Sequence, residues 1–264
     1  MSIQVQISRI NGNISSAYLA AQGKGASMPS LLNSDNLSAT IQSIPQGSSS
    51  GQIGDKKPGN IVHVFMSGMF RSWLIWKVGG APNEDYYGYP PDTIFLLHMR
   101  AFEQWRWNNA NVADVENSEI HLRLNTEFYG MFEPWLQNQI IEGRVPYRVG
   151  ASGATIGRGK DGLLTKIILP SAHELGLDPR ATVIGADFGL FTNNGSRITL
   201  DASGNTVAHH TRTPAAAATS VQRVTATGGE GTVTASTMTG TFVRPAIALS
   251  PTVRFDSNNI LINS

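Results

Sequence analysis

The residues closest to a phosphate-binding pattern are the glycines of GASGATIGRGKDG, residues 150–162. A phosphate loop requires spaced glycines, then a lysine followed by serine or threonine, and then a helix. Here Ala154 stands where the first glycine belongs, Lys160 is followed by Asp161, and no helix is predicted next. Ser152 lacks the spaced glycine and the strand-to-helix setting of a nucleophile elbow. We therefore expect a loop or a hairpin tip.

The six histidines form no catalytic or metal-binding pattern. None has the helical spacing with a glutamate that zinc sites use. His209 and His210 are adjacent, so in a strand their side chains point to opposite faces. The segment with His173 and Glu174 is expected to be a surface turn. The sequence therefore predicts no metal ion and no cofactor.

Three neighbouring carboxylates, those of Asp114, Glu116 and Glu119, are the nearest approach to an acid and base pair. Hydrolysis of a glycan requires two carboxylates across one cleft. These three instead adjoin an apolar stripe of helical spacing, formed by Val115, Ile120, Leu124 and Phe128. We interpret them as the start of a helix capped by Asn117 or Ser118, and we expect no enzyme activity.

Tyrosines mark a first candidate binding loop. Tyr86, Tyr87 and Tyr89 lie between Pro82 and Pro90, which predicts a loop. Exposed tyrosines in this loop would stack on a sugar ring or on a partner chain. Packing in the core is the alternative, and it is the expectation for most of the five tryptophans.

The composition excludes several classes of function. Among 264 residues there is no cysteine, which excludes thiolate catalysis and zinc–thiolate sites. A net charge of +1 provides no basic field for nucleic acid or an anionic membrane. No apolar run approaches the ~20 residues that span a bilayer, and the first residues lack a secretory pattern. We expect a protein assembled in a cytoplasm, without membrane insertion.

Residues 1–45 are predicted to form a helical docking or oligomerisation element. Isoleucines recur at spacings of four and three, at Ile3, Ile7, Ile10 and Ile14. This spacing is typical of a short coiled coil, and isoleucine at both seam positions favours higher oligomers, here a trimer. It also fits an amphipathic helix that packs on its own neighbour. A second short helix, capped by Ser34 or Asp35, is expected to follow.

The rest of the chain is predicted to be a linker and one domain. Residues 46–59 are rich in Gly, Ser and Pro, which is typical of a flexible linker. Residues 60–264 begin with strands and helices and end in strands joined by turns, with hairpins at ASGN and GGEG. The sequence therefore predicts an α+β fold with short N-terminal helices, early domain helices and late antiparallel hairpins.

Five segments in order carry a family resemblance: WRWNNANVADVENSEIHLRLNTEFY, VPYRVGASG, GLLTKIILPSAHELG, HTRTP and FVRPAIAL. They resemble a domain of unknown function found in tail proteins of phages that infect Gram-positive and gut bacteria, and in surface proteins of their hosts. The resemblance covers roughly residues 60–261. MSIQVQISRINGNIS, GKGASMP and NLSATIQSIP likewise resemble the helices that precede Gly/Ser linkers in such phage proteins.

The late hairpins also look like the C-terminal half of C-type-lectin-like folds related to formylglycine-generating enzymes. In phage proteins of that fold, loops near the C-terminus can bind the receptor. By this analogy, residues 215–240 are a second candidate binding region, with Thr219, Gln222, Arg223 and Glu230 as its candidate residues.

The resemblance implies a phage virion structural protein of tail fibre, tail tip or baseplate type. It would bind a glycan or protein on the host surface, contact other virion proteins through residues 1–45, form a homo-oligomer, and bind no nucleic acid. The alternative is a capsid decoration, head-fibre, collar or other structural component without a host ligand.

An arginine followed by a proline interrupts the apolar run TGTFVRPAIALSP. A buried guanidinium is tolerable only when its donors are satisfied, and its five donors can join several loop carbonyls. Pro245 lacks an amide donor, so a strand at a sheet edge or beside a bulge is expected. TRTP, with Arg212 and Pro214, repeats the pairing. We interpret these four residues as structural, with Arg244 as a clamp on the late hairpins.

Replacement of the clamp should therefore affect folding. Arg244→Ala is expected to lower the free energy of unfolding, measured by denaturant titration, because loop carbonyls would lose their donor. A variant with unchanged unfolding but lost ligand binding would contradict this interpretation.

Overall fold

The computed structural model describes residues 10, 13–15, 17–18, 29–30, 33–37, 51–79, 86–152, 154–177 and 183–263. The chain divides into two compact units, Met1–Ser50 and Gly51–Ser264, which we describe separately. No helix in these ranges is long and apolar enough to cross a membrane.

The N-terminal unit contains helical turns at residues 13–15 and 34–37. The hydroxyl of the buried Tyr18 donates to the carbonyl of Asn33, at 2.7 Å. Asn33 also accepts from the Asn36 amide at 3.1 Å, so it caps the second helix in place of the expected Ser34 or Asp35. Of the predicted seam, Ile10 is exposed and Ile14 is half-buried, whereas Ile3 and Ile7 lie outside the described residues.

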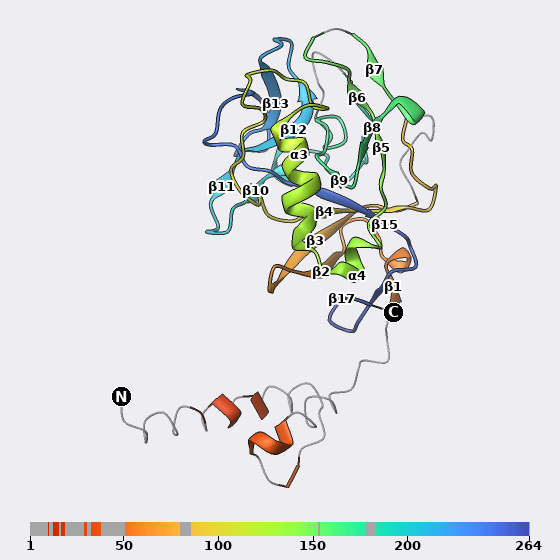
Figure 1. Ribbon diagram of the computed structural model, residues 1–264, viewed down its shortest axis with the longest axis vertical. Coiled ribbons are helices and arrows are strands. Elements are labelled where there is room, and N and C mark those ends of the chain that lie inside the picture. The colour runs from red at the N-terminus through yellow and green to blue at the C-terminus, as the bar shows by residue number, and fades with distance from the viewer. Residues whose placement is uncertain are drawn as a thin grey trace, which may run out of the picture. The chain divides into compact units, whose positions relative to one another are not determined.

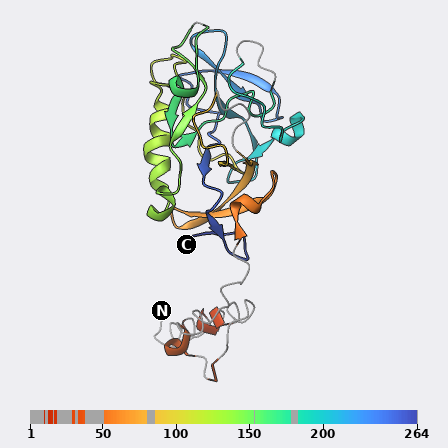
Figure 2. The ribbon, with the colours of Figure 1, turned by 90° about the vertical axis from the view of Figure 1, so that its right-hand side faces the viewer.

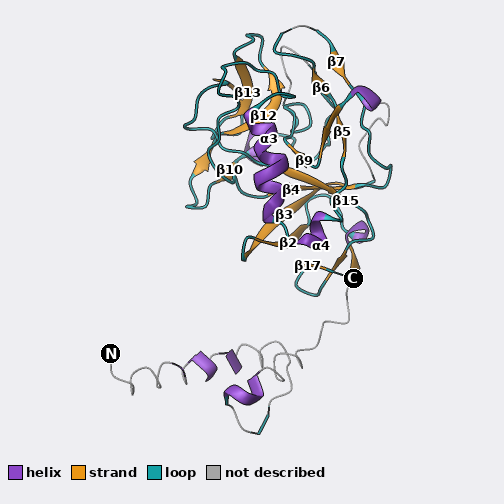
Figure 3. Cartoon of the chain, viewed as in Figure 1, coloured by secondary structure: helices purple, strands orange, loops and turns teal. Residues whose placement is uncertain are grey.

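A five-stranded antiparallel sheet forms the centre of the second unit (Figures 1 and 3). Its order is β2 (Ile61–Met66), β3 (Met69–Lys77), β4 (Ile94–His98), β15 (Ala246–Leu249) and β9 (Ile167–Ile168). β15 therefore lies inside the sheet, and the expectation of an edge strand is wrong. Pro245 precedes the strand, so its missing amide removes no bond from the ladder, and its carbonyl accepts from the His98 amide at 2.9 Å.

Smaller antiparallel sheets surround the central one. Two of them have three strands: β1 (Gly51–Gln52) with β16 (Arg254–Phe255) and β17 (Leu261–Ile262), and β12 (His209–Pro214) with β13 (Ser220–Val224) and β14 (Glu230–Thr234). The other three are two-stranded: β5 (Gly143–Val145) with β8 (Leu163–Thr165), β6 (Tyr147–Arg148) with β7 (Ile156–Gly157), and β10 (Thr199–Leu200) with β11 (Thr206–Val207). Two 3-10 turns, η1 (Ile53–Asp55) and η4 (Gly159–Asp161), complete these regions.

One longer helical segment runs along the side of the domain (Figure 2). It comprises α3 (Glu119–Arg123), the π-helical turn η2 (Leu124–Phe128) and the 3-10 turn η3 (Tyr129–Met131). Ser118 caps it by accepting from the His121 amide at 3.1 Å. The predicted apolar stripe is buried, because it packs on the central sheet. α4 (Pro134–Gln137) and α5 (Asn194–Arg197) are single turns.

The predicted α+β class, with its early helices and lectin-like outline, is wrong. The described residues form mostly β-strands in small antiparallel sheets, with one helix of more than two turns. α4, which begins at Pro134, already ends at Gln137, and β5 follows at Gly143. The reason is that short apolar segments are buried here by pairing with distant strands, which short-range periodicity cannot distinguish from burial in a helix.

The predicted linker also differs from the structure. Residues 51–55 form β1 and η1, and Ile53 is buried. The Ile53 amide donates to the Val253 carbonyl at 2.8 Å, which fixes this segment against the C-terminal strands. One apolar side chain and a distant strand partner are enough to order a stretch whose composition is that of a linker.

A buried ion pair joins Arg212 of β12 to Glu174 in the turn after β9. The Arg212 Nη1 donates to Glu174 Oε2 at 2.6 Å, and its Nη2 donates to Oε1. Arg212 also donates to the carbonyls of Pro146 and Leu169, at 2.8 and 2.9 Å. Burial alone lowers the pKa of Arg212, but the Glu174 carboxylate more than offsets this and holds it above its usual value.

Glu174 accepts further donors from two more segments. The Tyr87 hydroxyl donates to Oε1 at 2.6 Å, and the Ser171 amide donates to Oε2 at 2.9 Å. Gly185 lies against this group with φ +83, and a Cβ there would come within 2.6 Å of the Tyr87 hydroxyl. Glycine is therefore required for both its conformation and its size. The expectation that Glu174 lies in a surface turn is wrong, because its carboxylate is fully bonded inside the core.

Three more buried arginines bind backbone carbonyls. Arg244 Nε donates to the His98 carbonyl at 3.0 Å, and its guanidinium lies 5.4 Å from the Phe191 ring centre. Burial lowers the pKa of Arg244 to about 10, so it stays charged at neutral pH. Arg148 donates to the Ala215 carbonyl at 3.1 Å, and Arg197 donates to that of Gly228 at 2.9 Å.

Three of the histidines are buried and neutral. Burial lowers the pKa of both His98 and His210 to about 4, and that of His209 well below its usual value. Backbone carbonyls of Arg100 and Trp105 accept from His98 Nδ1 and His210 Nε2, at 2.5 and 2.8 Å. His98 and His210 therefore act as hydrogen-bond donors in the core, whereas neither ring nitrogen of His209 has a hydrogen-bond partner among the described residues.

Breaking the Arg212–Glu174 ion pair should lower the free energy of unfolding of the domain. Glu174→Gln leaves a buried guanidinium without its counter-charge and is expected to cost about 3–5 kcal/mol in urea unfolding. The matched control is Glu127→Gln, which breaks the exposed pair with Arg123 and should cost less than about 1 kcal/mol. Equal losses in the two variants would contradict the importance of the buried pair.

Acid should destabilise the domain through its buried histidines. A histidine whose folded pKa is about 4 binds a proton only after unfolding, so its contribution is complete above pH 6.5 and is lost as the pH falls toward 4. The loss is about 3 kcal/mol each for His98 and His210. Urea unfolding across this range measures it. His210→Gln should reduce the number of protons bound on unfolding by one.

Candidate binding site

The predicted tyrosine loop is mostly buried. Tyr87 and Tyr89 lie in the core, where Tyr87 contacts Glu174 and the Tyr89 ring lies 5.2 Å from that of Phe95. Burial raises the pKa of both phenols. Tyr86 is half-buried beneath Arg158, whose guanidinium lies 4.7 Å from its ring centre. Tyr87 and Tyr89 therefore cannot stack on an external ligand, because the core already occupies their rings.

The late hairpin contributes less exposed surface than expected. Gln222 is buried and donates to Glu230 at 3.2 Å. Arg223 is half-buried and donates to the Thr241 hydroxyl at 3.0 Å. Thr219 and Glu230 are exposed. The candidate region thus reduces to the turn before β13 and to the β13–β14 hairpin.

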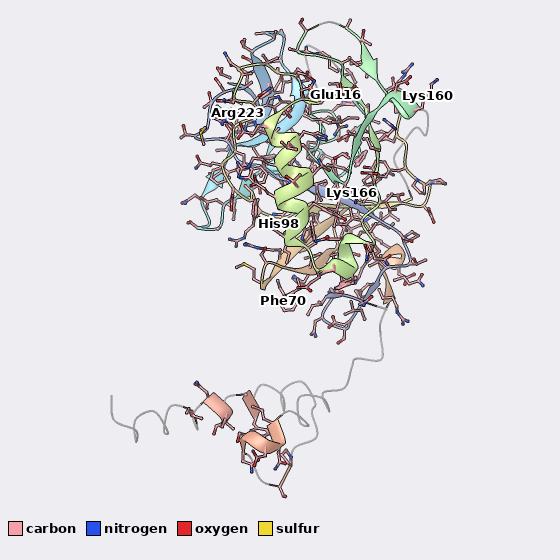
Figure 4. The ribbon with its side chains drawn as sticks, viewed as in Figure 1. Phe70, His98, Glu116, Lys160, Lys166 and Arg223 are labelled. Atoms are coloured by element: carbon pink, nitrogen blue, oxygen red, sulfur yellow. The ribbon has the colours of Figure 1, made fainter. Side chains whose placement is uncertain are left out.

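An open groove of about 390 Å³ lies where the loop after Trp107 meets the start of α3. Its lining is mixed in character, and consists of Asn108, Asn109, Glu116, Asn117, Ser118, Glu119, His121 and Leu122. Figure 4 labels Glu116 near the upper end of the helix, on the surface. Two of the three carboxylates noted in the sequence therefore lie in one hollow.

Local hydrogen bonds hold the walls of the groove. The Asp114 carboxylate accepts from the Glu116 amide at 3.2 Å and from the Asn117 side chain at 2.7 Å. Tyr147 donates to Glu116 Oε2 at 3.1 Å, and Arg106 donates to Glu119 Oε2 at 2.5 Å. Both carboxylates are thereby fixed in position with oxygens still able to accept.

Several groups in the groove remain available to a ligand. Within the described residues, the Asn109 amide and Glu116 Oε1 make no hydrogen bond. Burial lowers the pKa of His121, which is therefore neutral at neutral pH. Leu122 is 62% exposed at the edge. The groove offers an amide, carboxylate oxygens, an imidazole and one apolar surface.

The structure brings the exposed Thr219 turn next to this groove. The Ala113 amide donates to the Ala218 carbonyl at 2.8 Å, and the Asn108 amide donates to that of Ala235 at 2.9 Å. The Ala235 amide in turn donates to the Thr219 carbonyl at 2.8 Å. One of the two predicted binding regions therefore borders the groove.

The sequence pattern did not single out Asn108, Asn109, His121 and Leu122, which line the groove. A signal was present in the helical pattern, since Leu122 is an apolar residue outside the buried stripe. Two consecutive asparagines after Trp107 were a second signal. Among the described residues, no group of three or more His, Asp or Glu side chains is placed to bind a metal ion.

Residues 91–251 match the family model described as Domain of unknown function (DUF6273). None of the curated proteins and none of the solved structures compared with the chain matches it. The matched region contains the groove, the Arg212–Glu174 pair and Arg244, and it covers more than half of the chain. The chain therefore belongs to the DUF6273 family.

Proposed function

We propose that this chain is a non-enzymatic structural protein of a phage virion, of tail fibre, tail tip or baseplate type. In this proposal the N-terminal unit attaches it to other virion proteins, and the domain binds a glycan or protein on the host surface. The virion assignment is supported by the ordered motifs and by the resemblance of the N-terminal segments to those of phage tail proteins.

The groove beside α3 is the observation that supports host binding. Fixed carboxylates accept hydrogen bonds from hydroxyl groups, and a free amide both donates and accepts. The exposed Leu122 offers an apolar surface to C–H groups. A hollow with a few fixed polar groups beside apolar area is typical of small-ligand sites. A neutral, hydroxyl-rich ligand such as a surface glycan fits this combination best.

A non-catalytic role is supported by the hydrogen bonds and ion pairs that the carboxylates already make. Glu174, the most buried carboxylate, is bonded to an arginine, a tyrosine and a backbone amide. In the groove, Glu119 is paired with Arg106 and Glu116 accepts from Tyr147. These contacts hold each carboxylate in place as a hydrogen-bond acceptor, which suits binding.

A purely structural virion component is the second candidate. It is favoured by exposed apolar side chains on the β2–β3 hairpin, among them Phe65 and Phe70. Apolar surface of this kind is typical of contacts with other protein chains.

Substitution in the groove tests the proposed site. Asn109→Ala with Glu116→Gln should weaken binding of the labelled full-length chain to host cells by about tenfold or more, because two ligand hydrogen bonds are lost. The measurement is a titration followed by flow cytometry, with purified host surface polysaccharide as competitor. Asn258→Ala removes an exposed amide from a different turn and is the matched control.

Each outcome separates the two candidates. Unchanged binding in the double variant would exclude the groove, and absence of binding by the unaltered chain would favour the purely structural role. Mass spectrometry of purified particles tests the virion assignment, which fails if peptides of this chain are absent.

A further inference from the structure

The charged side chains that line the groove beside α3 are of one sign. They are Glu116 and Glu119, and among the described residues of the lining there is no lysine or arginine. Figure 4 shows Glu116 at the surface near the upper end of the helix. The Asp114 carboxylate accepts from the Glu116 amide at 3.2 Å, so a third negative charge lies beside these two.

The Arg106 guanidinium is paired with Glu119 and is not one of the described residues that line the groove. Its Nε lies 2.5 Å from Glu119 Oε2, and its Nη1 donates to the Met238 sulfur at 3.9 Å. Only 27% of the Arg106 side chain and 28% of the Glu119 side chain are exposed, so the pair is partly shielded from solvent. The two charges cancel, and the pair adds almost no net charge to the groove.

Glu116 keeps its negative charge without a cationic partner among the described residues. Its partner is the Tyr147 hydroxyl, at 3.1 Å. Burial, the hydrogen bond to Glu116 and the charges of Glu116 and Asp114 together raise the pKa of Tyr147 to about 12. The phenol therefore stays a neutral donor at neutral pH. His121 is neutral as well, because burial lowers its pKa. The groove thus carries the full negative charge of Glu116.

A negative groove distinguishes glycans by their charge. Some glycans carry only hydroxyl groups, and others also carry carboxylate or phosphate groups. The hydroxyl groups of an uncharged glycan can donate to Glu116 Oε1, which is free within the described residues. An anionic group in the same place would be repelled. At a separation of about 6 Å and the effective dielectric of a protein surface, this repulsion weakens binding about tenfold or more.

We propose that the groove selects uncharged glycans against acidic ones, and that Glu116 and Glu119 set this selectivity. The inference rests on the proposed function, because it concerns the ligand of the same groove. Glu116 repels an anionic ligand directly, whereas Glu119 is a positioning residue that holds Arg106 in an ion pair. Loss of both carboxylates would leave the Arg106 charge unbalanced, and the groove would then favour acidic glycans.

A matched pair of polymers tests the selectivity. The probes are purified host surface polysaccharide and the same polysaccharide with its primary hydroxyls oxidised to carboxylates. Binding of both to the full-length chain is measured by biolayer interferometry. The oxidised polymer should bind about tenfold more weakly or worse. Conversion of its carboxylates to neutral amides should restore binding, because the loss comes from the charge and not from the missing hydroxyls.

Substitutions test the two assigned residues through the ratio of the two affinities. Glu116→Gln should bring this ratio close to one, and Glu116→Gln with Glu119→Gln should invert it. The matched control, Glu142→Gln, removes an exposed carboxylate that does not line the groove and should leave the ratio unchanged. The ratio is informative even where a variant binds both polymers more weakly.

A salt series tests the charge effect on the unaltered chain, so it holds even for a variant that misfolds. Between about 0.1 M and about 1 M salt the Debye length falls from about 10 Å to about 3 Å, which should bring the ratio toward one. A ratio that does not change with salt would show that shape, and not charge, separates the polymers, and would overturn the inference.

The outcomes also separate this inference from the proposed function. Equal or stronger binding of the oxidised polymer overturns the selectivity alone, and a ratio unchanged by Glu116→Gln overturns the role of Glu116. Binding to host cells but to neither polymer overturns the inference and leaves a protein ligand for the groove. Absence of binding to host cells overturns the proposed host binding together with the inference.

Discussion

The ion pair between Arg212 and Glu174 holds together segments that secondary structure does not join. One guanidinium reaches carbonyls after β5 and after β9 as well as the carboxylate, and the carboxylate then collects Tyr87 and the Ser171 amide. A pair of buried charges repays its desolvation only when nearly all donors and acceptors are satisfied. The loops that contain Tyr87, Pro146 and residues 169–174 are therefore fixed together against β12.

In this domain, buried arginine side chains donate hydrogen bonds to backbone carbonyls. Most strands here have two to five residues, so ladder hydrogen bonds alone would leave many loop carbonyls unpaired. Arg148 and Arg197 donate to such carbonyls from within the domain, and Arg244 donates to the carbonyl of His98 at the end of β4. A guanidinium suits this task because its planar donors diverge and its charge persists even when burial lowers the pKa.

Short-range pattern predicted some elements and could not predict others. The stripe from Val115 to Phe128 located the main helix, and Ser118 is the one of its two expected caps that the structure shows. Glu174 was assigned to the surface because its partner is 38 residues away, and no local signal marks such a pair. The tyrosines were placed in an exposed loop for the same reason. The groove required knowledge that Thr219 and Asn108 lie on adjoining turns, which only the tertiary structure provides.

The position of β15 has a consequence for how the protein is made. This strand, at residues 246–249, lies between β4 and β9 in the central sheet. Until residues 246–249 have been synthesised, β4 and β9 have no strand between them, and their unpaired edges remain open to other chains. Contacts so distant in sequence also form slowly. The central sheet can therefore close only once β15 has left the ribosome.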